Sequence, residues 1–277
     1  MIHPTAIVHP KAKLDRSVSI GPYSVIDEGV EIGADCIIGP HVYLTGLTAI
    51  GAGNHFFSGC VIGEAPQDLK YRGEPSWVRI GEHNVFREHV TVHRSSNTEE
   101  ATVIGSRNFL MAHAHVGHNC QVGNSVILAN SVLLGGHVTV GDRAVVSGNC
   151  AIHQFVRLGT LSLMQGCSAL SQDLPPYSIA HQVNILCGLN IVGLRRAGFS
   201  PDERLELKRL YRALFRRGLK LRTALKAAEK EFTSSAAKEM LNFIAASTRG
   251  VCADPGRGRV RDKEKQADRD AAGGGMG

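Results

Sequence analysis

The stretch VGHNCQVGNSVILANSVLLGGHVTVGDRAVVSGNC, residues 116–150, repeats a six-residue pattern that decides the fold. Every sixth residue from Val116 is aliphatic, and the residue two places before each of these is small or β-branched. Two inward residues in every six predict a short strand followed by a turn, because strand side chains alternate between two faces. Glycine often follows the aliphatic residue, as Gly117 and Gly135 do, and we expect it to ease the turns because it tolerates positive φ.

The same pattern runs through most of the chain. From Ile2 to Leu170, 26 of the 29 positions spaced six apart hold a large apolar side chain. The exceptions fall in two segments, 64–79 and 93–103, after which the pattern resumes in phase, so we expect loops that project from a rigid scaffold. Strands this short cannot bury a core alone, but three per coil can stack into a parallel β-helix. The sequence therefore predicts a mainly β fold for residues 1–187.

The composition limits the possible functions. The chain has 277 residues, 43% hydrophobic and 5% aromatic, and contains no apolar run long enough to span a membrane. Its start lacks the features of a signal peptide. The seven cysteines form no CxxC pair, and four occupy small inward positions: Cys36, Cys60, Cys120 and Cys150. We expect free thiols in a cytoplasmic protein, and no zinc held by cysteine clusters.

Residues 188–250 predict a small α-helical C-terminal domain. The segment Ser200-Pro201-Asp202-Glu203 is a capping box with proline at the first helical position, and helical spacing continues as far as Gly218. Two further helices are expected, near residues 223–232 and 236–247. The final segment, 251–277, is rich in glycine, arginine and aspartate, which predicts a disordered tail.

Basic side chains concentrate in residues 195–231. This segment has 12 lysines and arginines against five acidic residues. The excess predicts a docking surface for an acidic partner, and the alternative is a solvated helix face. No aromatic platform or groove-reading motif accompanies the charge, so we expect no nucleic-acid partner.

Three histidines of the repeat form a candidate reactive group. Because their neighbours take the inward positions, His113, His115 and His118 point outward. Residues 18 apart stack in successive coils, which places Gly136 and then Gln154 above His118. Histidine can remove a hydroxyl proton near neutral pH, and a backbone N–H such as that of Gly136 can stabilise an oxyanion. A general base for acyl transfer is favoured over two alternatives, which are a zinc site between subunits and surface histidines without a function.

Several motifs that the six-residue repeat does not explain resemble those of a known protein family. The motifs are Gln67-Asp68-Leu69-Lys70-Tyr71, Thr91-Val92-His93-Arg94, Gly136-His137-Val138, His153-Gln154-Phe155, Gly166-Cys167-Ser168, Gly188-Leu189-Asn190 and Arg195-Arg196. Together they resemble the UDP-N-acetylglucosamine O-acyltransferases. The resemblance covers residues 1–250 in one order, whereas the repeat alone is shared by many unrelated acyltransferases.

The resemblance implies a fold and a reaction. It implies a left-handed coil, which periodicity alone does not show, and a homotrimer with active sites between neighbouring coils. It implies transfer of an (R)-3-hydroxyacyl chain from acyl carrier protein to the 3-hydroxyl of UDP-N-acetylglucosamine, the first step of lipid A biosynthesis. No metal or cofactor is implied, because the phosphopantetheine thioester of the carrier protein is the donor substrate.

The family's functional positions carry over residue by residue. His118 matches the general base and Gly136 the oxyanion donor. Gly166 matches the position that limits the acyl chain, and an open glycine there implies a chain of about 14 carbons. The resemblance implies substrate binding by Gln67, Asp68, Leu69, Lys70, His115, His137, Gln154, Asn190 and Arg196. Three positions depart from the family: Asn119 stands where many relatives have aspartate beside the base, and Val192 and Ala197 replace polar and basic residues near the nucleotide.

Two other functions remain as alternatives. A related sugar N-acyltransferase of the same pathway would carry an additional N-terminal uridine-binding domain, whereas here the repeat begins at Ile2. A non-enzymatic structural β-helix would not need His118, Gly136 and Gln154 stacked outward beside two loops that preserve the phase of the repeat.

Overall fold

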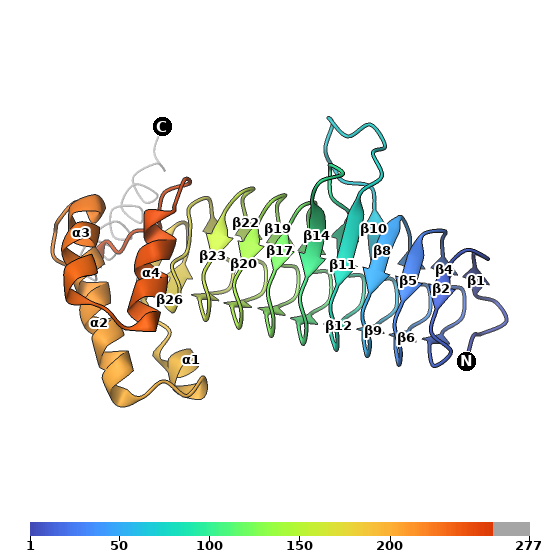
Figure 1. The fold of residues 1–277 in the computed structure, drawn as a ribbon, viewed down its shortest axis with the longest axis horizontal. Helices are drawn as coiled ribbons and strands as arrows, with labels where there is room; N and C mark the ends of the chain where they lie inside the picture. The colour runs from blue at the N-terminus through green and yellow to red at the C-terminus, as the bar shows by residue number, and fades with distance from the viewer. Residues whose placement is uncertain (257–277) are drawn as a thin grey trace, which may run out of the picture.

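The structure is a computed structural model, and it describes residues 1–256. Its strands stack into a long coil, and helices pack at the C-terminal end of that coil (Figure 1). Three sheets form the sides of the coil, and from β1 to β26 consecutive strands along the chain belong to different sheets. The mainly β architecture predicted from the repeat is confirmed.

Each sheet collects every third strand of the coil as far as β25, and β26 and β27 extend the third sheet. The first sheet contains β1 (Ile7–Val8), β4 (Val25–Ile26), β7 (Tyr43–Leu44), β10 (Val61–Glu64), β13 (Thr91–His93), β16 (His115–Val116), β19 (Leu133–Leu134), β22 (Ala151–Ile152) and β25 (Ala169–Leu170). The second contains β2 (Lys13–Leu14), β5 (Val30–Ile32), β8 (Leu47–Ile50), β11 (Trp77–Ile80), β14 (Ala101–Ile104), β17 (Gln121–Val122), β20 (Thr139–Val140) and β23 (Arg157–Leu158). The third contains β3 (Ser19–Ile20), β6 (Ile37–Ile38), β9 (His55–Phe56), β12 (Val85–Phe86), β15 (Phe109–Leu110), β18 (Ile127–Leu128), β21 (Val145–Val146), β24 (Leu163–Met164), β26 (Ser178–His181) and β27 (Ile185–Leu189).

Strand pairing follows the expected stacking of one coil on the next. Val25 pairs with Tyr43 in parallel, and this spacing recurs as far as β25 wherever no loop intervenes, whereas Leu163 of β24 pairs with Ile179 of β26 at a shorter spacing. Across the segment between β10 and β11, Val61 pairs with Thr91, and across the segment between β13 and β14, Thr91 pairs with His115. Both segments therefore leave the coil and return in register, and Figure 1 shows the excursion between β10 and β11 projecting from its side.

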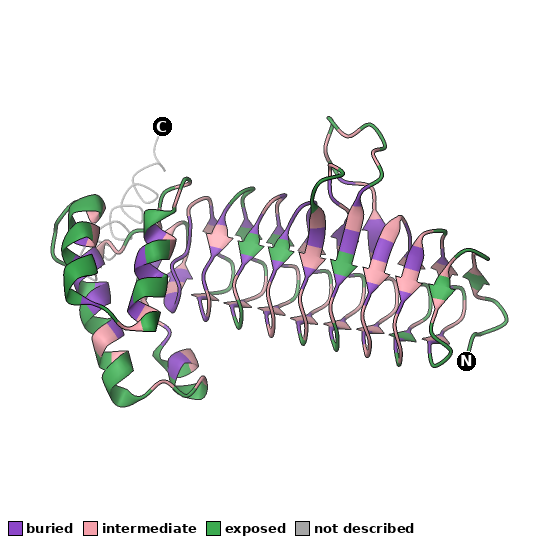
Figure 2. Ribbon diagram, in the orientation of Figure 1, coloured by how far each residue is buried: buried purple, intermediate pink, exposed green. Residues whose placement is uncertain are grey.

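The interior of the coil holds the two predicted sets of inward residues. The large set is buried at every repeat from Ile20 to Leu170 where the pattern holds, and Phe56 stacks on Phe86 with 4.5 Å between ring centroids. The four cysteines of the small set are buried free thiols, as expected. Figure 2 shows the resulting alternation of buried and exposed residues along the strands. Each buried aliphatic side chain contributes about 1.5–3 kcal/mol, so the stability of the coil is spread along its length.

The corner glycines have a different role from the expected one. Among the described glycines that follow a large inward residue, Gly63 alone has a positive φ, and the left-handed position falls two residues later in the turn, for example at Asn119. A Cβ on Gly117 would lie 2.8 Å from the carbonyl oxygen of Leu134 in the next coil. The expectation of positive φ at these glycines was therefore wrong, and close approach of successive backbones is the reason for glycine there.

Four helices are described: α1 (Ile191–Arg196), α2 (Pro201–Phe215), α3 (Leu221–Glu231) and α4 (Ser235–Ala245). The predicted capping box is present, because the Ser200 hydroxyl accepts the Glu203 N–H and the Glu203 carboxylate accepts the Ser200 N–H. Helices α2, α3 and α4 confirm the three that were expected, whereas α1 was not expected. None of the described helices is long and apolar enough to cross a membrane.

The segment expected to be a tail begins with ordered residues. Val251 forms a β-bridge with Asp173. The carboxylate of Asp254 accepts a hydrogen bond of 2.7 Å from the Arg216 guanidinium. These contacts attach the chain to α2 and to the end of the coil, so the order extends further than the composition indicated. The rest of the predicted tail, residues 257–277, lies outside the described residues.

Candidate active site

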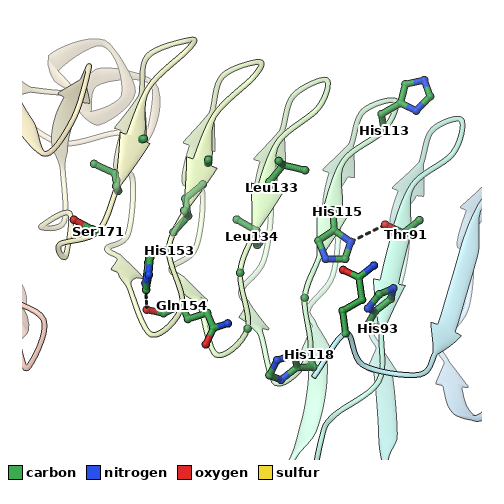
Figure 3. A pocket seen from close by; sticks show the side chains of 18 of the residues that line it. Thr91, His93, His113, His115, His118, Leu133, Leu134, His153, Gln154 and Ser171 are labelled. Atoms are coloured by element: carbon green, nitrogen blue, oxygen red, sulfur yellow. Dashed lines mark hydrogen bonds between the residues drawn. The ribbon is translucent and has the colours of Figure 1, made fainter. Parts of the chain in front are cut away.

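A cavity of about 800 Å³ lies against the outer face of the first sheet. Outward side chains of β13, β16, β19, β22 and β25 form its floor, and the corner turns that follow these strands form one edge. Five predicted site residues line it: Gln67, His115, His118, Gly136 and Gln154. Figure 3 shows His115 and His118 near one end of the cavity and Gln154 further along the coil.

His118 occupies the corner turn between β16 and β17, where the repeat directs its side chain outward. The residue is only 7% exposed, because the next coil stacks against it. A Cβ on Gly136 would lie 2.5 Å from both Nε2 and Cε1 of His118. Gly136 therefore leaves open the space that the imidazole fills, and the column predicted from the sequence brings these two residues into direct contact.

Asn119 determines which nitrogen of His118 carries the hydrogen. Nδ1 of His118 lies 2.8 Å from Oδ1 of Asn119. The same oxygen accepts hydrogen bonds of 3.0 Å from the backbone N–H and from the hydroxyl of Ser96. A backbone N–H can only donate, so the amide oxygen is the atom that faces both Ser96 and His118. Nδ1 of His118 therefore carries the hydrogen, and Nε2 presents a lone pair beside Gly136.

Two further histidines near the base are held uncharged. Burial, together with smaller effects of the neighbouring His93 and His118, lowers the pKa of His115 to about 4. Burial also lowers the pKa of His93, against the opposing effect of the Glu64 carboxylate. Nδ1 of His115 is 2.7 Å from the hydroxyl oxygen of Thr91. Near neutral pH, His115 and His93 therefore add no positive charge to the cavity.

His137 lies on the opposite side of His118 and faces a second hollow. Its ring is nearly perpendicular to that of His118, with 5.2 Å between centroids, and it stacks on Phe155 at 4.5 Å. The second hollow, of about 460 Å³, lies against the outer face of the second sheet and is also lined by Glu100 and Asn119. His137 therefore contacts the candidate base but lies outside the main cavity.

The predicted residues of the first loop extend away from the cavity. Gln67 reaches the cavity, whereas Asp68, Leu69 and Lys70 do not line it. The Asp68 carboxylate accepts the backbone N–H of Lys70 at 2.9 Å, which closes a turn, and Leu69 is 96% exposed. This loop therefore carries its polar side chains out beyond the surface of its own coil.

Three other predicted residues also lie outside the cavity of the single chain. Asn190 caps α1, with its Oδ1 accepting the Gly193 N–H and its Nδ2 donating to the Leu161 carbonyl, both at 2.9 Å. Arg196 is exposed at the end of the same helix. Gly166 lies in the exposed turn before β25, where an added Cβ would meet no atom closer than 3.5 Å.

Part of the cavity floor was missed by the sequence analysis. Thr91 lies beside His115, and an apolar strip continues along the coil through Leu133, Ala151 and Ala169. All of these residues immediately precede a large inward residue, so the repeat places them on the outer face. For Thr91 the regular spacing was lost, because the second loop separates Thr91 from His115 by 24 residues, whereas Leu133, Ala151 and Ala169 follow His115 at the regular spacing and could have been found from it.

The fold and the site together define a transferase of the hexapeptide-repeat class. The sequence model of the bacterial transferase hexapeptide repeats matches residues 11–46 and 101–136. The model of domain 2 of UDP N-acetylglucosamine O-acyltransferase matches residues 173–252. Within residues 1–256, no three histidine, cysteine, aspartate or glutamate side chains are grouped so that they could hold a metal ion.

Full-length relatives identify the family. The acyl-[acyl-carrier-protein]--UDP-N-acetylglucosamine O-acyltransferase of Thermodesulfovibrio yellowstonii is 45% identical over 254 residues, covering 91% of this chain and 98% of the relative. The enzyme of the same name from Syntrophobacter fumaroxidans is 46% identical and covers 90% and 98%. The structure of Francisella novicida UDP-N-acetylglucosamine acyltransferase superposes with a TM-score of 0.87 at 35% identity, covering 92% of this chain and 95% of that one. The chain belongs to the UDP-N-acetylglucosamine O-acyltransferase family and is an acyltransferase, and its coil is a left-handed parallel β-helix.

Proposed function

We propose that this protein transfers an (R)-3-hydroxyacyl chain from acyl carrier protein to the 3-hydroxyl of UDP-N-acetylglucosamine, the first step of lipid A biosynthesis. The observation that carries the proposal is the pairing of a free Nε2 lone pair on His118 with Gly136 at one edge of the cavity. Relatives that span nearly the whole chain are named acyl-[acyl-carrier-protein]--UDP-N-acetylglucosamine O-acyltransferase, which supports the donor, the acceptor and the O-acyl transfer. The donor thioester belongs to the carrier protein, so the proposed reaction needs no cofactor of the enzyme.

The proposed mechanism uses His118 twice. Its Nε2 removes the proton from the sugar 3-hydroxyl as the oxygen attacks the thioester carbonyl carbon. The carbonyl oxygen becomes an oxyanion, and the Gly136 N–H stabilises it, because no acceptor within residues 1–256 takes that hydrogen. When the tetrahedral intermediate collapses, the carbon–sulfur bond breaks and His118 returns the proton to the departing phosphopantetheine thiolate. The backbone N–H does not need to move during this cycle.

The apolar strip on the first sheet is the proposed path of the acyl chain. Leu133, Ala151 and Ala169 follow one another from coil to coil, at a strand spacing of about 4.8 Å. The strip leads from His115 towards β25, and Gly166 lies in the turn before that strand. We assign Gly166 to the far end of the chain, where the absence of a side chain leaves room for about 14 carbons.

The proposed active form is a homotrimer. Several large apolar residues on the outside of the coil support it, because they are about half exposed or more in the single chain: Ile7, Tyr23, Leu133 and Phe155. A neighbouring coil would cover the apolar strip and close the cavity. We assign Asp68, Lys70 and Gln154 to the sugar and acyl groups, and Asn190 and Arg196 to the nucleotide, with the Arg196 guanidinium suited to its phosphates.

The proposed dock for acyl carrier protein is the basic surface of α2. Arg209, Arg212, Arg216 and Arg217 surround a shallow hollow there, with Glu231 as its acidic member. Positive charge of this density attracts an acidic partner over several ångströms. We place the reaction in the cytoplasm, an assignment supported by the free buried thiols inside the coil.

A turnover assay with 3-hydroxyacyl carrier protein tests the proposal. The expected result is acylation of UDP-N-acetylglucosamine and release of the carrier thiol in equal amounts. A parallel reaction offers an acceptor that has an amine in place of the 3-hydroxyl. Transfer to the amine with none to the hydroxyl would support the N-acyltransferase alternative. No transfer to either acceptor would overturn the proposed reaction.

A further inference from the structure

Asn119 can fix the tautomer of His118 only if the side-chain amide of Asn119 keeps a single orientation. The amide oxygen must face the Nδ1 hydrogen of His118, which leaves the NH2 group pointing away from the ring. An amide that rotated by half a turn would present N–H donors to Nδ1. The ring hydrogen would then move to Nε2, and the lone pair needed by a general base would be lost. The orientation of the Asn119 amide is therefore a condition for the proposed chemistry.

Two side chains of the second loop receive the Asn119 NH2 group. Nδ2 donates to Oε2 of Glu100 at 2.9 Å and to the hydroxyl oxygen of Ser95 at 2.7 Å. The backbone N–H of Asn119 donates to the hydroxyl of Thr102 at 2.8 Å, so its main chain is fixed as well. A hydroxyl can accept or donate, whereas an ionised carboxylate can only accept. If the amide rotated, its oxygen would face the Glu100 carboxylate, and neither group could donate a hydrogen bond. Of the two partners of Nδ2, Glu100 is therefore the one that disfavours the rotated amide.

We infer that Glu100 is a positioning residue for catalysis, acting on His118 through the amide of Asn119. The inference rests on the proposed function, because it concerns the base of that reaction. The chain of contacts runs from the Glu100 carboxylate to Asn119 Nδ2, and from Asn119 Oδ1 to His118 Nδ1. A charged acceptor makes the stronger kind of hydrogen bond, so it favours one amide orientation more than a neutral partner does. The Glu100 carboxylate at Nδ2 therefore reinforces the direction of the Asn119 amide that the Ser96 backbone N–H favours at Oδ1.

Replacing Glu100 tests this chain of contacts, because loss of a positioning residue should lower kcat and leave KM nearly unchanged. Glu100→Ala removes the acceptor and should lower kcat by about tenfold or more, with KM for the sugar nucleotide changed less than about threefold. Glu100→Gln keeps an acceptor oxygen within reach of Nδ2 and should recover most of the lost kcat. Glu99→Ala is the matched control, because Glu99 is exposed on the same loop and its side chain makes no hydrogen bond or ion pair with the described residues.

The hydrogen position on His118 provides a readout that does not require turnover. ¹⁵N NMR of the imidazole at pH 8 should show the Nδ1–H form in the wild type and in Glu100→Gln. Glu100→Ala should shift part of the population to the Nε2–H form. An unchanged tautomer together with an unchanged kcat in Glu100→Ala would overturn the inference. A wild-type protein that transfers no acyl group would overturn the proposed function. The tautomer measurement would still show whether Glu100 sets the orientation of the Asn119 amide.

A second variant keeps the inference testable if Glu100→Ala disturbs the loop. Asn119→Asp tolerates the left-handed backbone at this position, where φ is 59°. It would, however, bring a carboxylate against that of Glu100, and two close carboxylates cannot both ionise without cost. Asn119→Asp should therefore lower kcat, and the double variant Asn119→Asp/Glu100→Gln should recover it, because glutamine can donate to the new carboxylate. Additive effects in this double-mutant cycle would contradict a direct interaction between the two positions.

Discussion

The imidazole of His118 fills the space that a side chain on Gly136 would occupy, with Nε2 of the ring 2.5 Å from the Cβ position of residue 136. The two residues lie one coil apart and face the same cavity. Gly136 therefore has a steric role as well as the backbone role that the sequence indicated. The geometry of the base depends on the absence of a single methyl group.

Gly136→Ala should displace the His118 ring while leaving the coil folded. The backbone of Gly136 does not have a positive φ, so alanine is compatible with its conformation. We expect kcat to fall by about 100-fold, because a displacement of about 1 Å at a reacting group costs this much. Gly148→Ala is the control, since its Cβ would meet only an ordinary 3.4 Å contact with Asn130. Equal turnover of the two variants would argue against the steric role.

His118→Ala should remove the proposed general base. The expected loss in kcat is about 100-fold or more, within the range for loss of general-base catalysis. Circular dichroism and gel filtration should show a folded protein with the oligomeric state of the wild type, because the side chain points out of the core. Turnover close to that of the wild type would remove His118 from the mechanism.

The free energy of unfolding should fall as the pH is lowered from 7 to 5. The folded state holds the pKa of His115 at about 4, below its ordinary value of 6.5. Protonation therefore favours the unfolded chain, and this stabilisation is complete above pH 6.5 and lost as the pH falls towards 4. The contribution of His115 between pH 7 and 5 is about 2 kcal/mol. Denaturant titrations of the wild type and His115→Asn measure it, and equal pH dependence of the two would contradict the prediction.

Salt should weaken the interaction with acyl carrier protein. Raising the ionic strength from about 0.05 to 0.5 M shortens the screening length to well below 10 Å and should raise KM for the carrier protein. Arg209→Glu/Arg212→Glu should raise it at low salt by about tenfold and remove most of the salt dependence. Arg16→Glu, at the other end of the coil, is the control. A KM that is independent of salt would favour the solvated-face alternative.

Gly166→Met should shorten the preferred acyl chain. A Cβ at this position meets only ordinary contacts, at 3.5 Å or more, so the added side chain can extend over the surface without disturbing the coil. In competition among 3-hydroxyacyl donors of about 10, 12 and 14 carbons, the wild type should prefer the longest and the variant a shorter one, through steric overlap. A wild-type preference for the shortest donor, or an unchanged preference in the variant, would exclude Gly166 from this role.

The inner architecture was predictable because it depends on local periodicity. The positions of His118 and Gly136 follow from the 18-residue coil, and their contact is confirmed. The partners of Asn119 were not predictable, because Ser96 and Glu100 lie on a loop whose path no periodicity describes. Contacts between that loop and the corner depend on tertiary packing, which the sequence pattern does not show.

The two loops also have a consequence for folding. Because the sequence pattern repeats every six residues, the strands can pair in many registers of nearly equal energy. A shift of the register by one repeat would preserve most inward contacts. The Arg94 guanidinium donates to the Gly63 carbonyl at 2.7 Å and to the Tyr71 hydroxyl at 3.1 Å, a combination with no equivalent one repeat away. Slipped pairing would sacrifice these bonds and bury part of a polar loop. The two loops, which bring Gln67 to the cavity and Glu100 to Asn119, thus also break the translational symmetry of the coil and select a single alignment of its strands.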